Sequence, residues 1–465
     1  MALGKRIPIQ QPLFISTLDL NIRPHPFYVA VNKVLDSHHF DTYAEDLCAK
    51  FYADEGRPGL APGIYFRCLL LGYFEGIDSE RGIDWRCNDS NSLKLFLGVP
   101  CDKPAPDHST LSRTRRLIDT ETHGEVFKYV LKILANHDLI DGKTVGVDST
   151  TLEANAAMRS IVRRDTGEGY QEFLTKLARE SGIETPTRED LAKLDKKRKN
   201  KASNDDWTNP HDPDAKITKM KDGTTHLAHK AEHAVDMGEN GNGVILAVNL
   251  CDAAVGDTAT LVDTLVLTTE NLAALKDDER VADKVSDDFM DEAVLDKGYH
   301  SKQALLDLEE MGTRSYASEP NRGRQTWDGQ ADAQAATYAN RRRVKGNRGK
   351  KLLRGRGEKL ERTFAHCYET GAMRHLYLRG RDNIAKRVLI HAAGCNIGIM
   401  MRVKYGLRKP RSHSGGGFAP YFGLVRLLSR GFEAFGEILM GVRAIQNASP
   451  IFQHIVRLSL SLTAA

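Results

Sequence analysis

The chain has 465 residues, of which 41% are hydrophobic and 28% are charged, and its formal net charge at pH 7 is +4. This composition describes a soluble globular protein, and the length exceeds one ordinary hydrophobic core, so we expect two or three domains. Seven scattered cysteines without a Cys-x-x-Cys pair argue against a disulfide framework or a zinc site and suit a reducing cytoplasm.

The first 125 residues are predicted to form a mainly helical N-terminal domain. The chain begins without an apolar signal core, because Lys5 and Arg6 are followed by Ile-Pro-Ile-Gln-Gln-Pro. Apolar runs at 62–73 and 90–97 indicate two of the helices.

A further helix is predicted to begin after the prolines that follow Lys103. Asp107, Ser109 or Thr110 can cap this helix. Its early turns carry three arginines, Arg113, Arg115 and Arg116. A short turn that feeds an arginine-rich helix is typical of a DNA-contacting helix-turn-helix, and a solvated basic helix face fits equally well.

A buried strand that ends on a carboxylate comes next. An amphipathic helix at 121–137 leads through a turn at Asp141-Gly142 into the β-branched run 144–147, which is followed by Asp148. A strand that delivers an Asp at its exit places a metal ligand on a rigid element. Capping of the following turn is the alternative interpretation of Asp148.

Residues 159–215 differ in character from the chain on either side. They are rich in charge and poor in large apolar side chains, so we predict an inserted helical hairpin with an irregular polar tip. The basic run 196–201 within it either contacts phosphates or ends a solvated helix.

Strand patterns return at 226–235 and 243–254, and the Gly and Asn residues between them predict an antiparallel hairpin. His226, His229 and His233 lie in the first of these strands, and their spacing would suit a zinc site on a helix. A strand scatters the three rings, and no cysteine lies near them, so a zinc site is disfavoured.

A helix capped by Asp257 or Thr258 precedes a second β-branched run that also ends on an acid. The predicted strand 293–295 delivers Asp296, and a short strand at 314–317 follows. Asp148 and Asp296 are therefore both expected at strand exits.

The segment 341–362 is strongly basic. It contains eleven lysines and arginines, opposed only by Glu358 and Glu361. Such a density of cations is either an exposed arm or a surface that meets a polyanion. Beyond it, the apolar stretch 388–401 is too short to span a bilayer and is predicted to be part of a buried helix.

Three acids thus stand out, Asp148, Asp296 and an acid near position 361. Magnesium ions prefer such oxygen ligands, and two ions held close together by carboxylates support in-line phosphoryl displacement. The lysines and arginines around these acids would contact the DNA backbone.

Five stretches carry a resemblance to a known family. In order, they are Pro106-Asp-His-Ser-Thr-Leu-Ser-Arg, Val147-Asp148-Ser-Thr-Thr-Leu-Glu-Ala-Asn-Ala, Asp212-Pro-Asp-Ala-Lys-Ile-Thr-Lys with His226 and Lys230, Leu295-Asp296-Lys-Gly-Tyr-His-Ser, and Leu360-Glu361-Arg-Thr-Phe364 running on to Leu378-Arg379-Gly380. Together they resemble the motifs of DDE transposases of bacterial insertion sequences. The resemblance spans most of the chain.

The resemblance implies an α/β fold with an RNase H-like mixed sheet flanked by helices. This catalytic domain would occupy 126–402, with the helical insertion at 159–215, and the helical domain 1–125 would bind DNA ends. The role of the C-terminal helical tail, 403–465, stays open.

The resemblance also implies the chemistry. Asp148, Asp296 and Glu361 would ligate two Mg²⁺ ions, for which Mn²⁺ can substitute. The enzyme would cut double-stranded DNA at the terminal inverted repeats of its element and join the 3′-hydroxyl ends to target DNA. It would act as a homodimer in the bacterial cytoplasm, associated with the nucleoid. The predicted DNA contacts are Arg113, Arg115, Arg116, Lys230, Lys297, Arg362, Arg374 and Arg379.

The sequence departs from the family pattern around the third acid. Relatives often carry a lysine where this chain has Tyr368, and the tyrosine and arginine sometimes found before the Glu are here Arg354 and Gly357. Glu358 and Glu369 are the alternatives to Glu361 by spacing. Two other functions stay open, an RNase H-like nuclease or resolvase without strand transfer and a DNA-binding protein that has lost catalysis.

Overall fold

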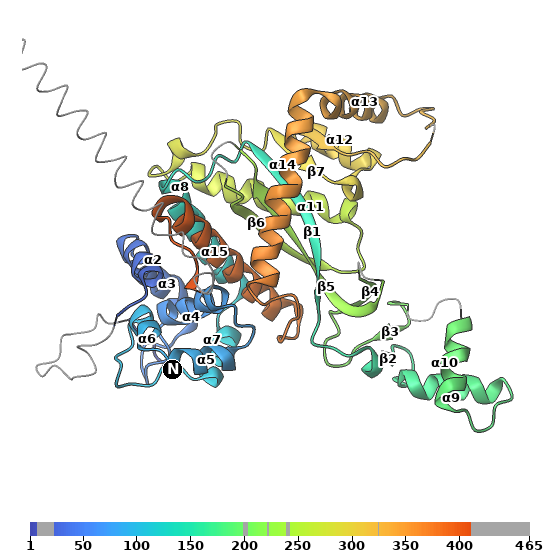
Figure 1. Cartoon of the computed structure of the whole chain (residues 1–465), viewed down its shortest axis with the longest axis horizontal. Helices are drawn as coiled ribbons and strands as arrows, with labels where there is room; N and C mark the ends of the chain where they lie inside the picture. The colour runs from blue at the N-terminus through green and yellow to red at the C-terminus, as the bar shows by residue number, and fades with distance from the viewer. Residues whose placement is uncertain (7–22, 199–202, 221–222, 239–241, 324, 411–465) are drawn as a thin grey trace, which may run out of the picture. The chain divides into compact units, whose positions relative to one another are not determined.

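The computed structural model describes residues 1–6, 23–198, 203–220, 223–238, 242–323 and 325–410. A run of helices precedes a mixed β-sheet that is flanked by further helices and interrupted by a helical insertion (Figure 1). The glycines 415–417 and the amphipathic segment 424–440 of the tail lie outside the described residues, as does part of the basic run 196–201.

The described N-terminal region is helical, which confirms the helices expected at 62–73, 90–97 and 121–137. Its helices are α2 (Pro26–Ser37), α3 (Phe40–Cys48), α4 (Pro62–Glu75), α5 (Glu80–Asn88), α6 (Asn91–Leu97), α7 (His108–Leu117) and α8 (Thr120–Asn136). Of the three predicted caps of α7, Asp107 is the one observed, because its carboxylate accepts a hydrogen bond from the amide of Ser109 at 2.8 Å.

The sheet combines an antiparallel half with a parallel half. Its strands are β1 (Thr144–Glu153), β4 (Lys216–Lys219), β5 (Thr225–Asp236), β6 (Ile245–Asp252), β7 (Glu292–Leu295) and β8 (Arg314–Ala317). β5 lies antiparallel between β1 and β6, which confirms the predicted hairpin, and β4 pairs with the first residues of β5. β7 and β8 follow on the other side of β1, and both run parallel to it.

The insertion contains the predicted helical hairpin. Its elements are β2 (Val162–Arg163), α9 (Tyr170–Glu180), α10 (Arg188–Lys197) and β3 (Trp207–Thr208). β2 and β3 pair as a two-stranded sheet, and the buried Trp207 packs edge-on against Tyr170 and Phe173. Trp207 belongs to a buried cluster that also includes Leu227 of β5, whereas Leu174, Ala178 and Leu191 form a small cluster within the hairpin itself.

Five longer helices complete the described fold: α11 (Asp257–Lys276), α12 (Lys302–Glu310), α13 (Ala331–Lys345), α14 (Asn347–Phe364) and α15 (Arg381–Tyr405). The predicted cap of α11 is wrong, because Gly256 occupies the N-cap position and makes no side-chain cap bond. α15 is long and apolar enough to span a membrane by length and composition, but most of it is buried against α8, α4 and β6. This confirms the buried helix expected there.

α14 approaches β1 closely because β1 carries a glycine at their contact (Figure 1). A Cβ at Gly146 would lie 2.7 Å from Leu360 Cδ1 and 2.5 Å from Met237 Sδ. Side chains alternate along a strand, so Asp148 shares the α14 face with Gly146. Ser149 faces the other side, where it meets Asp257 of α11.

Two glycines of α14 make a matched pair for a stability test. A Cβ at Gly349 would lie 2.2 Å from the carbonyl oxygen of Arg343, at the corner between α13 and α14, whereas a Cβ at Gly357 would meet nothing within 4 Å. We expect Gly349→Ala to lower the free energy of unfolding by about 2 kcal/mol through this clash. Gly357→Ala should raise it by about 0.5–1 kcal/mol through helix propensity, as measured by urea unfolding. Equal effects of the two changes would contradict this packing.

Candidate functional site

The parallel pairing of β1 and β7 brings the two predicted aspartates together. Val147 is the register partner of Leu295, so Asp148 and Asp296 are the next residues on adjacent strands. Neighbouring strands lie about 4.8 Å apart. The carboxylate of Asp296 also accepts a hydrogen bond from the amide of Gly298, which holds it at the end of β7.

The strand exit predicted for Asp148 is wrong, whereas the one predicted for Asp296 is confirmed. Asp296 follows the last residue of β7, but β1 continues beyond Asp148 to Glu153. The prediction failed because β1 stays paired with β5 through a run of hydroxyl residues that looked like a turn. Asp148 instead marks the point where β1 loses β7 as its neighbour.

Asp148 is held by a basic residue that the sequence did not single out. Arg356 of α14 donates from Nη1 to Asp148 Oδ2 at 2.9 Å, and the amide of Ser149 donates to Oδ1 at 2.8 Å. Burial raises the pKa of the Asp148 carboxyl, Arg356 and the Ser149 amide oppose that rise, and the negative charge of Asp296 adds to it. One signal for Arg356 was available, since it lies one turn before Leu360 on the α14 face that meets β1.

Glu361 lies on α14 but not among the sheet contacts. Its side chain is exposed, about 100° around the helix from the buried Leu360. Among the described residues, Asp148, Asp296 and Glu361 do not form a group whose ligand atoms all lie within 4.8 Å of one another. The alternatives are both engaged, since Glu358 pairs with Arg362 and Glu369 pairs with Arg374.

The chain leaves α14 through a π-helical turn, Ala365–Glu369, beside β5. Its buried Tyr368 hydrogen-bonds through the hydroxyl to His233 Nε2 at 2.6 Å, and His233 is the register partner of Asp148. π-turns of this kind are frequent at functional sites. Tyr368 therefore supports the strand beside Asp148.

The three histidines of β5 have separate partners, so they do not form a shared zinc site. His226 lies 3.1 Å from Glu153, and His229 hydrogen-bonds the buried Asp212 at 3.2 Å. His233 bonds Tyr368 on the α14 side. The strand scatters the rings as expected.

A second polar network lies on the opposite face of β1 and was missed in the sequence. Lys230 is buried, and its ammonium group donates to Val255 O at 2.8 Å, to Thr260 Oγ1 at 3.1 Å and to Asp257 Oδ1 at 3.3 Å. Ser149 donates to the same Asp257 oxygen at 2.9 Å. The donors of Lys230 therefore serve this internal network, and its DNA contact stays a prediction.

Five of the eight predicted DNA contacts have exposed side chains: Arg113, Arg116, Lys297, Arg362 and Arg379. Arg374 is half-buried, because it donates to Thr150 Oγ1 at 2.9 Å and to Thr151 O at 3.0 Å beside the free edge of β1. Arg115 is buried, pairs with Glu80 of α5 and donates to Asn383 of α15 at 3.3 Å. The guanidinium of Arg115 therefore holds helices together, and its DNA contact stays a prediction.

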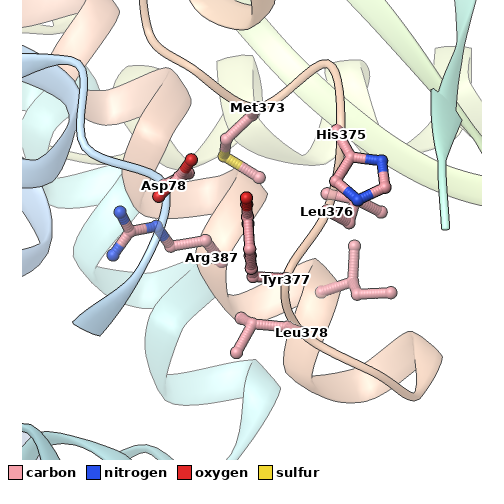
Figure 2. A pocket seen from close by; sticks show the side chains of 8 residues that line it. Asp78, Met373, His375, Leu376, Tyr377, Leu378 and Arg387 are labelled. Atoms are coloured by element: carbon pink, nitrogen blue, oxygen red, sulfur yellow. The ribbon is translucent and has the colours of Figure 1, made fainter. Parts of the chain in front are cut away.

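Two other features lie apart from Asp148 and Asp296. Among the described residues, Asp84, Asp107 and His108 have ligand atoms within 4.8 Å of one another, but the amide of His108 donates to Asp84 at 3.1 Å and Asp107 caps α7. A small cavity lies beside Arg387 of α15 and Tyr377 (Figure 2). Neither feature includes an aspartate of the sheet.

The N-terminal helices match a known family. Residues 16–117 match the family model described as a transposase domain (DUF772), and the matched segment ends at the last residue of α7. The match supports a transposase family. It therefore supports an enzyme that acts on DNA. No curated protein matches the chain.

Arg113 and Arg115 should differ sharply in a paired test, although they lie two residues apart. Arg115→Ala leaves Glu80 without its buried partner, so we expect the free energy of unfolding to fall by about 3 kcal/mol. Arg113→Ala should leave stability unchanged, lower DNA affinity and reduce the slope of log affinity against log salt by about 1. Thermal unfolding and salt-dependent DNA binding measure both, and a stable Arg115→Ala protein would refute the assigned role.

Burial lowers the pKa of His233 to about 3. In the unfolded chain, the imidazole of His233 takes up a proton near pH 6.5, whereas in the folded chain it stays neutral. The free energy of unfolding should therefore fall as the pH falls below 6.5. Between pH 7.5 and pH 5, His233→Gln should lose about 2 kcal/mol less stability than the wild type. Urea unfolding at the two pH values measures this difference, and parallel losses in both proteins would contradict it.

Proposed function

We propose that the chain is a DDE transposase that cuts DNA at the terminal inverted repeats of its insertion sequence and joins the 3′-hydroxyl ends to target DNA. The observation that carries the proposal is that Asp148 and Asp296 occupy neighbouring positions on adjacent parallel strands. The transposase-domain match upstream of these strands supports the same reading.

The strand order supports an RNase H-like catalytic domain. Along the sheet, the order is β6-β5-β1-β7-β8, with the first three strands antiparallel and the last two parallel to β1. α14 lies against this sheet and carries the acid of the third motif. Fold similarity alone assigns no chemistry, so the proposal depends on the two aspartates.

The residues present suit magnesium, with manganese as a substitute. Carboxylate oxygens are the ligands that Mg²⁺ prefers, and the carboxylate of Asp148 already faces a positive charge in the guanidinium of Arg356. Asp148, Asp296 and Glu361 would hold two ions. Bound there, the ions would activate the attacking oxygen and stabilise the leaving oxygen of the phosphodiester. The three candidates for the third acid are Glu358, Glu361 and Glu369. Among the described residues, Glu361 is the one of them that forms no ion pair.

The chain's own basic residues would position the DNA. Arg113 and Arg116 are exposed on α7, and Lys297 is exposed beside Asp296. Arg362 near the end of α14 and Arg379 beyond the helix add exposed guanidinium groups. Such contacts fix register on the phosphate backbone without reading sequence. We propose a homodimer that holds the two paired ends, in the bacterial cytoplasm with the nucleoid.

A joining assay tests the proposal. An intact duplex that carries the terminal repeat, read from the DNA flanking the gene, reports cutting, and a pre-nicked one reports joining. Each is incubated with a target plasmid and Mg²⁺ or Mn²⁺. We expect Asp148→Asn and Asp296→Asn each to lower cutting and joining by more than about a hundredfold, since losing groups that merely orient metal ligands costs 10- to 100-fold. Chelation of the metal should have the same effect.

Glu270→Gln, an exposed change on α11, is the control and should leave both steps intact. Thermal unfolding shows whether each variant is folded. Cutting without joining by the wild type would favour the nuclease or resolvase, and activity retained by Asp148→Asn would refute the proposal.

A further inference from the structure

Asp148 is the one hydrogen-bond and ion-pair partner of Arg356 among the described residues. Arg356 Nη1 donates to Asp148 Oδ2, and no other hydrogen bond of the guanidinium is found among the described residues. A guanidinium carries five N–H donors in a planar fork, so most of them stay available to a second acceptor. The side chain is half-buried rather than enclosed, with 18% of its surface exposed.

Both oxygens of Asp148 are already engaged. Oδ1 accepts from the amide of Ser149, and Oδ2 accepts from Arg356. Each oxygen keeps a second lone-pair direction. A divalent cation at Oδ2 would nevertheless lie close to the guanidinium of Arg356, and the two positive charges would repel each other, so cation binding favours the departure of Arg356.

The surroundings of Arg356 leave space for an anion that would compete with Asp148 for the guanidinium. Arg356 is flanked by Gly355 and Gly357. A Cβ at Gly357 would meet nothing, and a Cβ at Gly355 would make only ordinary contact, at 3.7 Å from Met237 Cε. Packing therefore requires neither glycine, although each disfavours the helix. The bare backbone leaves room for a phosphodiester.

We propose that the guanidinium of Arg356 binds a phosphate of the DNA backbone and that it pairs with Asp148 in the absence of DNA. When DNA binds, the guanidinium exchanges the carboxylate for a phosphate, where bidentate contact is favourable, and Asp148 becomes free for a divalent cation. DNA binding and cation binding are then coupled through one side chain, and the coupling is reciprocal. This inference rests on the proposed function, because it assigns the ligand of a side chain within the same site.

The test measures Mn²⁺ affinity by titration, with and without a duplex of the terminal repeat, so it does not depend on activity. Arg356→Gln removes the competing charge. We expect it to bind Mn²⁺ at least about fivefold more tightly than the wild type without DNA, and to gain little further affinity when DNA is added. The wild type should tighten by a similar factor on adding DNA.

Arg354→Gln is the matched control, since Arg354 is exposed on the same turn, and its Mn²⁺ affinity without DNA should equal that of the wild type. Arg356→Lys keeps the charge without the planar fork, so it should retain most of the competition and bind DNA more weakly. Unchanged Mn²⁺ affinity in a folded Arg356→Gln protein would overturn the inference. A gain in Mn²⁺ affinity on adding DNA that is as large in this variant as in the wild type would also overturn it.

The joining assay separates this inference from the proposed function. An active wild type with unchanged Mn²⁺ affinity in Arg356→Gln overturns the exchange alone. A wild type that neither cuts nor joins DNA, while Arg356→Gln binds Mn²⁺ more tightly, overturns the function and leaves the exchange between guanidinium and cation standing.

Discussion

The register between β1 and β7 is the constraint on which the site depends. Asp148 lies level with Asp296 only while Val147 faces Leu295, and a one-residue slip would turn every side chain of β7 to the other face. The buried Glu292 holds this register at the far end of the strands. Thr144 of β1 donates to it at 2.7 Å, and Tyr316 of β8 donates at 3.0 Å, so one carboxylate joins three strands.

The same carboxylate also attaches α14. Arg348 donates to both oxygens of Glu292 at 2.7 and 2.6 Å, and burial would raise the pKa of Glu292 were it not for these hydrogen bonds, which lower it to about 2. Further along the helix, Lys359 donates to Met237 O at 3.1 Å, and Leu360 fills the space left by Gly146. The helix that carries Glu361 is thus fixed at both ends, and between them Arg356 pairs with Asp148.

The sequence predicted five of the six strands of the main sheet because their patterns are local, whereas β4 was not predicted. Asp296 lies where a β-branched run stops, and this pattern identified it correctly. Asp148 shows the limit of the same rule. A strand end is decided by its neighbours, and β1 continues because β5 pairs with it as far as Glu153. No local pattern in the hydroxyl residues after Asp148 reveals that pairing.

The basic residues were harder to interpret for a related reason. Arg113 and Arg115 look alike in sequence, but Arg115 is the one that pairs with Glu80. It also donates to Asn383 of α15, which lies 268 residues away in the chain. Lys230 likewise meets acceptors on α11 and the loop before it. Charge density predicts a surface for a polyanion, whereas the tertiary partner decides whether a given cation reaches that surface.

The two faces of β1 differ beside Asp148 and Ser149. The Ser149 face is paired internally, and the Asp148 face meets α14. Ser149 belongs to a closed network in which Asp257, Lys230 and Thr260 supply partners, so this face stays buried without unpaired charge. Asp148 faces α14, where its partner is the half-buried Arg356. A fully paired face can support an exchangeable one because the strand cannot shift without breaking the network. Strand alternation therefore separates the rigid support of the site from the carboxylate whose partner can change.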